Sequence, residues 1–128
     1  MSQDVKHPSK TKVIYEAERV LKGDGYFVFR RTQPHALFHV IAFSFNEVKM
    51  VQVLRLKKFN FKEINRELCK VQQFIEQEQA PKENLKCELW VWLNDKGWVK
   101  YNVHLDGSFE KFEDCGDHHF RKKNNKDV

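Results

Sequence analysis

The chain has 128 residues, of which 41% are hydrophobic and 32% are charged, so it is long enough for one domain with a single core and too apolar for a largely disordered chain. No apolar run approaches the roughly 20 residues that cross a bilayer, and the first ten residues lack the apolar centre of a signal peptide. We therefore expect a cytoplasmic protein without a membrane partner. The formal net charge of +5 favours a nucleic-acid partner without establishing one.

The three cysteines predict no disulfide and no metal centre. Cys69, Cys87 and Cys115 lie far apart without a Cys-x-x-Cys pair, so we expect reduced thiols, two of them in the core. The segment 115–119 holds a cysteine and two histidines, and His104 is a further candidate ligand. A structural zinc is disfavoured there because no second Cys/His pair has matching spacing.

The N-terminal part predicts an arm, a helix and a strand. Residues 1–9 are expected to be a flexible arm, and Ser9 is a candidate N-cap. A helix with one buried stripe follows from apolar residues at helical spacing. They are Val13, Ile14, Ala17, Val20 and Leu21. Gly23 and Gly25 end this helix, and 26–29 then predict a short strand.

The segment 39–58 is the most informative part of the chain, because it predicts a buried hairpin with its turn at Asn46 and Glu47. Its strands, 37–45 and 48–56, are nearly continuous apolar runs. We therefore expect both of their faces to be covered, as in a central sheet with helices packed on it.

A second helix and a second hairpin are expected next. Asn60 is a candidate helix cap with Glu63 at capping-box spacing, and an apolar stripe follows up to Pro81. Segments 87–93 and 98–105 predict the hairpin. Its last strand is expected to have one solvated face. That face carries Lys100, Asn102 and His104.

The tryptophans of this hairpin have two interpretations. Trp90 and Trp92 share one strand face, and Trp98 follows the turn. Exposed, they would stack on unpaired bases or form a dimer interface. We favour the alternative, in which helices cover both faces and the indoles belong to the core.

The expected order is helix, strand, strand, strand, helix, strand, strand. This is one three-layer α/β domain, 10–113, with a mixed central sheet, followed by a polar basic tail over 114–128. We find no internal repeat.

This order, with certain local patterns, resembles the PD-(D/E)xK nuclease superfamily, the restriction-endonuclease-like fold. The resemblance is nearest to archaeal Holliday junction resolvases. The residues that carry it are Glu16 and Glu18 in the first helix, the step 22–29, Pro34 ahead of 39–42, and 51–54.

The resemblance implies a metal site in which an Asp begins the second strand and a Glu-x-Lys lies near the end of the third. Matched by position, His39 replaces the Asp, Gln52 the Glu and Leu54 the Lys. Mg²⁺ prefers anionic oxygen ligands, so imidazole and a neutral amide are a poor replacement. We therefore expect a nuclease-like scaffold with a lost or degenerate metal site and no cofactor, and Mg²⁺ or Mn²⁺ only if catalysis survives.

Two arrangements would restore a site. Glu47 and Lys49 form a Glu-x-Lys motif, but this motif lies at the hairpin turn. Such residues more commonly belong to a solvated turn without a catalytic role. Glu18 would join His39 in a mixed site, although a solvated helical glutamate is more common. These residues carry the first alternative function, an active metal-dependent endonuclease.

Cations near the hairpin predict a nucleic-acid-binding edge. Arg30 and Arg31 leave the first strand, and Arg55, Lys57 and Lys58 close the hairpin. Phosphate contacts from such residues give affinity without reading sequence, and ordinary surface charge is the alternative. We expect a nucleic-acid-binding protein, with DNA as the first candidate. A protein–protein module is the second alternative, and the resemblance implies a symmetric homodimer.

Overall fold

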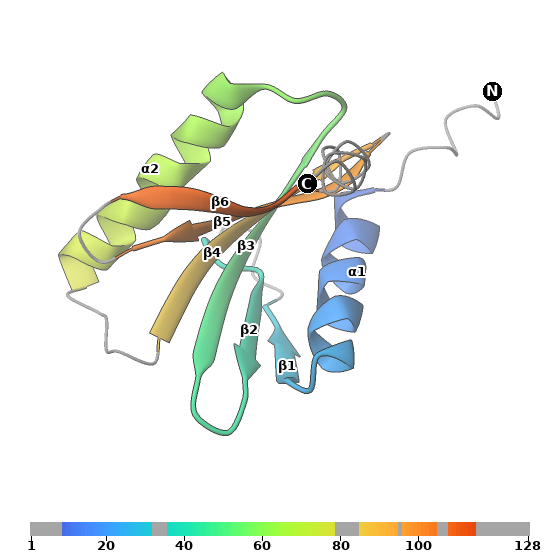
Figure 1. Ribbon diagram of the computed structural model, residues 1–128, viewed down its shortest axis with the longest axis vertical. Coiled ribbons are helices and arrows are strands. Elements are labelled where there is room, and N and C mark those ends of the chain that lie inside the picture. Colours follow the sequence, from blue (N-terminus) through green and yellow to red (C-terminus); the bar gives the residue numbers. More distant parts are fainter. Residues whose placement is uncertain (1–8, 32–35, 79–84, 95, 105–107, 115–128) are drawn as a thin grey trace, which may run out of the picture.

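The computed structural model describes residues 9–31, 36–78, 85–94, 96–104 and 108–114. Its elements are α1 (Lys10–Gly23), β1 (Phe27–Arg30), β2 (Val40–Phe43), β3 (Val48–Leu56), α2 (Phe61–Glu78), β4 (Leu85–Leu93), β5 (Gly97–Val103) and β6 (Phe109–Asp114), shown in Figure 1. Residues 1–8 of the expected arm, the tail beyond residue 114 and the disfavoured zinc segment 115–119 lie outside the described residues. None of the described helices is both long and apolar enough to cross a membrane.

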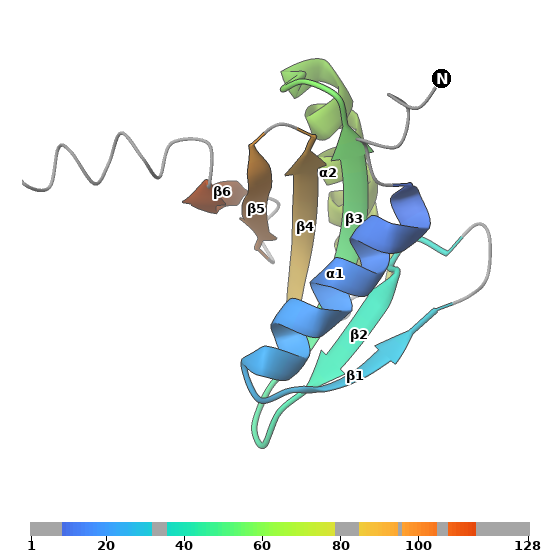
Figure 2. The ribbon, with the colours of Figure 1, turned by 90° about the vertical axis from the view of Figure 1, so that its right-hand side faces the viewer.

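The six strands form one mixed sheet in the order β1-β2-β3-β4-β5-β6. β3 and β4 are parallel, and every other neighbouring pair is antiparallel. α1 covers one face and α2 the other (Figures 1 and 2). The predicted three-layer α/β architecture and element order are confirmed. β6 is an addition, since its charged, alternating sequence gave no strong strand signal.

Local signals place α1 as expected. The Ser9 side chain accepts a hydrogen bond from the Lys12 backbone N–H at 3.2 Å and so caps the helix. Gly25 has a φ of 96°, a conformation that favours glycine, and turns the chain into β1. The buried stripe of Val13, Ala17 and Leu21 faces the sheet.

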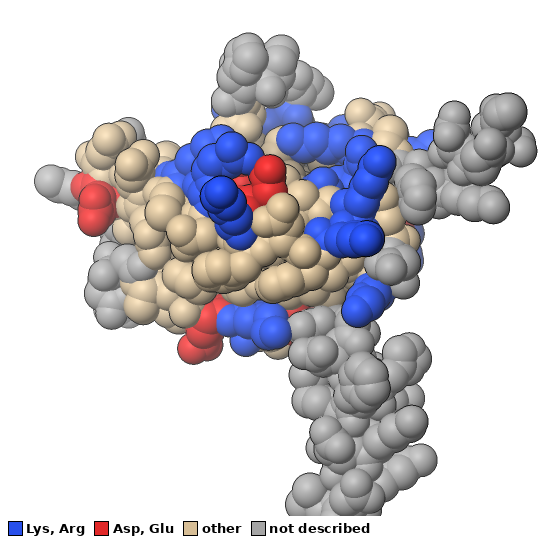
Figure 3. All heavy atoms as spheres, turned by 90° about the horizontal axis from the view of Figure 1, so that it is seen from above, with Lys and Arg blue, Asp and Glu red and all other residues tan. Residues whose placement is uncertain are grey.

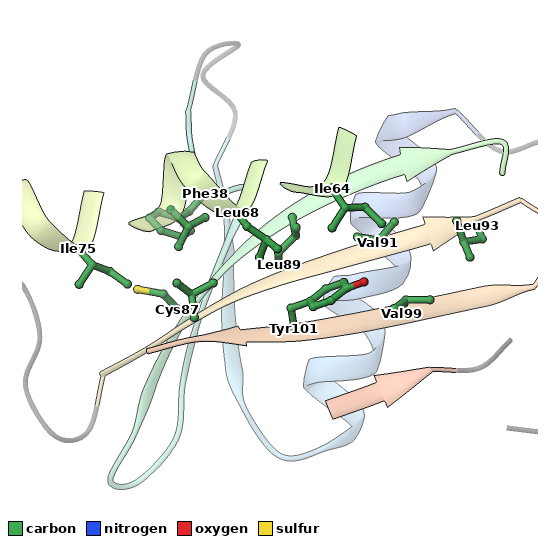
Figure 4. Packing of buried hydrophobic residues seen from close by; sticks show 12 residues of the cluster. Phe38, Ile64, Leu68, Ile75, Cys87, Leu89, Val91, Leu93, Val99 and Tyr101 are labelled. Atoms are coloured by element: carbon green, nitrogen blue, oxygen red, sulfur yellow. The ribbon is translucent and has the colours of Figure 1, made fainter. Parts of the chain in front are cut away.

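Each face of the sheet has its own core. On the α1 side, Trp90 and Trp98 are buried with valines of β2 and β3, which confirms the core interpretation for these two indoles. On the α2 side, Ile64 and Leu68 pack on Leu89 and Val91 of β4 (Figure 4). Because a strand alternates its faces, β4 contributes to both cores.

The expectation that both strands of the first hairpin are covered on both faces is wrong for β2. Phe43 of β2 and its neighbours Phe27 and Phe29 of β1 are exposed, Phe27 by 77% and Phe29 by 59%. These side chains lie on the α2 side, where α2 packs over β4 and β5 instead. The apolar run of β2 therefore indicated burial on both faces. The placement of α2 over β4 and β5 leaves the α2 side of β1 and β2 exposed.

The expectation of a solvated face on β5 is also wrong at Lys100, which is only 5% exposed. Its ammonium lies 3.8 Å from the centroid of the Trp90 ring and 3.2 Å from the Glu113 carboxylate. The unpredicted strand β6 brings Glu113 opposite Lys100, so the charge is buried with a partner.

Candidate functional site

His39 and Gln52, which the resemblance matched to the metal-binding acids of the family, meet beside one pocket. Val40 of β2 pairs with Val51 of β3, so the preceding His39 lies opposite the following Gln52. Both side chains line a cavity of about 310 Å³ on the α2 side of the sheet. Its other lining residues are Lys10, Ala36, Leu37, Val53, Leu54, Glu67 and Lys70.

His39 is a neutral hydrogen-bond donor in this pocket. Its Nδ1 accepts a hydrogen bond from the Val53 backbone N–H at 2.9 Å, which places the proton of the neutral ring on Nε2. Burial, together with the positive charge of Lys10, lowers the His39 pKa to about 4. Metal ligation through Nε2 would require loss of that proton while Nδ1 stays engaged, so this geometry opposes a metal-ligand role.

Gln52 has one engaged and one unpartnered end. It is 6% exposed, and its Nε2 donates to Glu67 Oε1 at 2.5 Å. Its Oε1 is buried and has no hydrogen-bond partner among the described residues. Because a carboxylate accepts only, the contact with Glu67 fixes which end of the amide is free.

The pocket obtains its charges from the helices. Leu54, at the position of the family's lysine, offers only alkyl surface, whereas Lys10 comes from α1 and Lys70 from α2. Lys70 lies 3.2 Å from Glu67 Oε2. Two lysines, one glutamate and a neutral histidine leave a net charge of +1 in the lining.

Sequence reasoning missed Lys10, Glu67 and Lys70 as pocket residues. A signal existed for Glu67, which lies three residues after Ile64 and four before Val71, at the margin of the buried stripe. No local pattern marks Lys10, because only the tertiary fold brings the start of α1 to this pocket.

Glu18 lies on the other side of the sheet from His39. Its carboxylate contacts Arg30 Nη1 at 2.6 Å and Lys22 Nζ at 3.1 Å. Burial raises its pKa, but hydrogen bonds from Lys22 and Arg30 outweigh this effect and the pKa is lowered. Arg30 also stacks on the Tyr15 ring, so Glu18 and Arg30 join α1 to β1.

Glu47 and Lys49 have different partners. Glu47 Oε2 accepts a hydrogen bond from the Tyr26 hydroxyl at 2.8 Å. Lys49 Nζ lies 3.4 Å from Glu88, whose other oxygen accepts from the Trp90 indole N–H at 2.8 Å. Within the described residues, no three His, Cys, Asp or Glu side chains gather so as to hold a metal ion.

Lys and Arg side chains concentrate at the end of the sheet where β3 and β4 finish and both helices begin (Figure 3). We call this surface the basic end. It comprises Lys10, Arg55, Lys57, Lys58, Lys62 and Lys96. None of the six forms an ion pair with another residue that the structure describes, and all except the half-buried Arg55 are exposed.

The predicted basic edge is therefore divided. Arg55, Lys57 and Lys58 belong to the basic end. β2 separates them from β1, and Arg30 is engaged by Glu18. Arg31 donates its backbone N–H to the His39 carbonyl at 2.7 Å, which places it beside the pocket strand.

No family model matches the sequence, and no curated protein matches it. Among solved structures, the chain is similar to Hjc, a Holliday junction resolvase from the archaeal hyperthermophile Archaeoglobus fulgidus. The TM-score is 0.48 and the sequence identity 13%, and the match covers 82% of this chain and 98% of that chain. Hjc belongs to the class of proteins that the element order resembled. The likeness concerns only the arrangement of helices and strands and assigns no residue roles.

Proposed function

We propose that the protein binds nucleic acid, with DNA as the first candidate, through the basic end and without metal-dependent cleavage at His39 and Gln52. The observation that carries this proposal is the group of cations around Arg55, Lys57 and Lys58, which form no ion pair within the part of the chain that the structure describes. Cations gathered on one surface attract the phosphate backbone and release its counterions.

The contrast with other cations supports a specific role for this surface. Away from the basic end, Arg19 pairs with Glu16, Lys22 with Glu18, and Lys86 with Glu47. Among the described residues, each of these cations thus forms an ion pair with a carboxylate, and none of the cations of the basic end does. Ordinary surface charge with counterbalancing acids does not describe such a distribution.

The chemistry of the pocket supports binding without cleavage. A hard cation needs anionic oxygens, and Glu67 is the only carboxylate among the lining residues. Its two oxygens are engaged by Gln52 and Lys70, and His39 already uses Nδ1.

The test is a fluorescence anisotropy titration with duplex, branched and single-stranded DNA and with duplex RNA, at 50 and 200 mM salt, concentrations that span the range of counterion effects. We expect salt-sensitive binding that a combined Arg55→Ala, Lys57→Ala and Lys58→Ala variant weakens. Lys22→Ala, which removes a paired lysine, is the control. No salt-sensitive binding to any of the four would defeat the proposal.

Incubation of the same DNAs with Mg²⁺ or Mn²⁺ tests the endonuclease alternative. Cleavage that Glu47→Ala or Glu18→Ala abolishes would favour it. The homodimer implied by the family resemblance stays a prediction, and a monomer mass by light scattering would contradict it.

A further inference from the structure

We propose that the pocket between β2, β3 and α2 receives one unpaired nucleotide of a bound strand, with its base against Gln52 and its phosphate beside Lys10 and Lys70. This inference rests on the proposed function and names the preferred feature of the nucleic acid, a nucleotide free of its pairing partner.

The size of the pocket suits a nucleotide. At about 310 Å³ it lies at the lower end of the range for small-molecule sites. A single phosphate would leave much of this volume empty. Leu37 and Leu54 supply apolar wall beside the polar groups, as the flat face of a base requires.

The free oxygen of Gln52 points to a ligand that donates a hydrogen bond. A buried acceptor without a partner is uncommon in folded proteins. The bond from Gln52 Nε2 to Glu67 holds the amide in one orientation, so a rotation that would present the amine instead breaks that bond. Every nucleobase carries at least one N–H on its pairing edge, and this edge is accessible only when the base is unpaired.

The remaining groups complement the rest of a nucleotide. The Nε2–H of neutral His39 is a donor for a base or sugar oxygen. Lys10 and Lys70 supply positive charge for a phosphate and keep the lining at a net +1 despite Glu67. Lys10 also belongs to the basic end, so the pocket adjoins the surface where a strand would bind.

The decisive experiment compares two DNA duplexes of equal length, one fully paired and one with a single unpaired nucleotide in a bulge. We expect the wild-type protein to bind the bulged duplex about fivefold to tenfold more tightly, the effect of a small number of buried hydrogen bonds. Gln52→Leu should bring the ratio of the two affinities close to one. Gln73→Leu, at an exposed glutamine of α2, is the matched control and should leave the ratio unchanged.

Outcomes separate the inference from the function on which it rests. Equal wild-type affinity for both duplexes overturns the nucleotide pocket and leaves nucleic-acid binding intact. If neither duplex binds, a direct titration decides the pocket, and the proposed function is defeated only if the branched DNA, the single-stranded DNA and the duplex RNA also fail to bind.

That titration uses the wild-type protein and follows the His39 imidazole by NMR during addition of deoxycytidine monophosphate, deoxycytidine or inorganic phosphate. It also replaces the duplex comparison if Gln52→Leu does not fold. A shift with the nucleotide that phosphate alone does not reproduce supports the pocket. No shift, or the same shift with inorganic phosphate, overturns it.

Discussion

Three of the described residues, Gln52, Glu88 and Lys100, have buried charged or amide side chains, and their partners decide what each does. Lys100 has Trp90 and Glu113, and Glu88 has Lys49 and the Trp90 indole N–H. Gln52 alone keeps a buried polar atom without a partner among these three. Satisfied groups stabilise the core, whereas the free oxygen of Gln52 marks the pocket as a place for a ligand.

The first prediction concerns Glu88, which is 2% exposed. Glu88→Ala leaves the Lys49 ammonium without its partner in a mostly buried position, so we expect a loss of about 3 kcal/mol in the free energy of unfolding. Urea denaturation measures it. Glu76→Ala, at an exposed position of α2, should stay within about 0.5 kcal/mol of wild type. Equal effects of the two substitutions would contradict the role of the pair.

The second prediction concerns the pH dependence of stability through His39. Its folded pKa of about 4 lies below the ordinary 6.5, so between these values the unfolded chain binds a proton that the folded chain does not. The contribution of neutral His39 is therefore complete above pH 6.5 and is lost as the pH falls towards 4. Because solvent partly reaches the imidazole, we expect on the order of 1–2 kcal/mol over this window.

His39→Gln removes the titration while keeping an acceptor for the Val53 N–H. The difference in unfolding free energy between this variant and wild type should change from pH 6.5 to pH 4. His104→Gln, at an exposed histidine, is the control. A difference that does not depend on pH would show that His39 is not held in its neutral form.

The secondary-structure elements follow the local signals of the chain well. How far the helices cover the sheet does not follow from those signals. Ser9 caps α1 and Asn60 caps α2, the latter through a bond from the Glu63 N–H to Asn60 Oδ1 at 3.2 Å. These signals act over three or four residues, so sequence alone reveals them. The exposure of Phe27 and Phe29 could not be predicted in this way, because it depends on how far α2 extends across strands distant in sequence.

The third prediction tests the packing of α2. Leu68 is 1% exposed and packs against the sheet, so Leu68→Ala should lower the free energy of unfolding by about 2–5 kcal/mol through lost burial and a cavity. Asn65→Ala on the exposed face of the same helix should change it by less than about 0.5 kcal/mol. Chemical denaturation of both variants gives the comparison, and a small loss for Leu68→Ala would mean that α2 contributes little to the core.

At the scale of the whole molecule, the described Lys and Arg residues of the basic end gather at one end of the sheet without ion-pair partners among the described residues. The net charge of +5 did not predict where the excess lies. The parallel pairing of β3 with β4 brings the ends of both strands, and with them Arg55, Lys57 and Lys96, to the same end of the sheet. Among the described residues these three cations form no ion pair, so their charge can attract a polyanion.

The fourth prediction is a quantitative salt dependence. If Lys57 and Lys58 each contact a phosphate of duplex DNA, each substitution to Ala should reduce the slope of log K against log salt by about 0.9. Binding isotherms over a salt series measure the slope. Lys22→Ala should leave it unchanged, since Lys22 is paired with Glu18. A slope that none of the substitutions alters would place the nucleic acid elsewhere.

The sequence by itself determined the helix caps, the order of the first seven elements and the alternation that puts Trp90 and Leu89 on opposite faces of β4, because each depends on neighbours in the chain. Through the resemblance, it also predicted that His39 and Gln52 stand at the positions of the family's acids, and this stays a prediction. Only the tertiary structure decided that these two side chains meet, since their distance depends on the register between β2 and β3. It likewise decided that Lys10, Glu67 and Lys70 complete the pocket and that β6 buries Lys100, because these contacts join segments whose local sequences carry no information about each other.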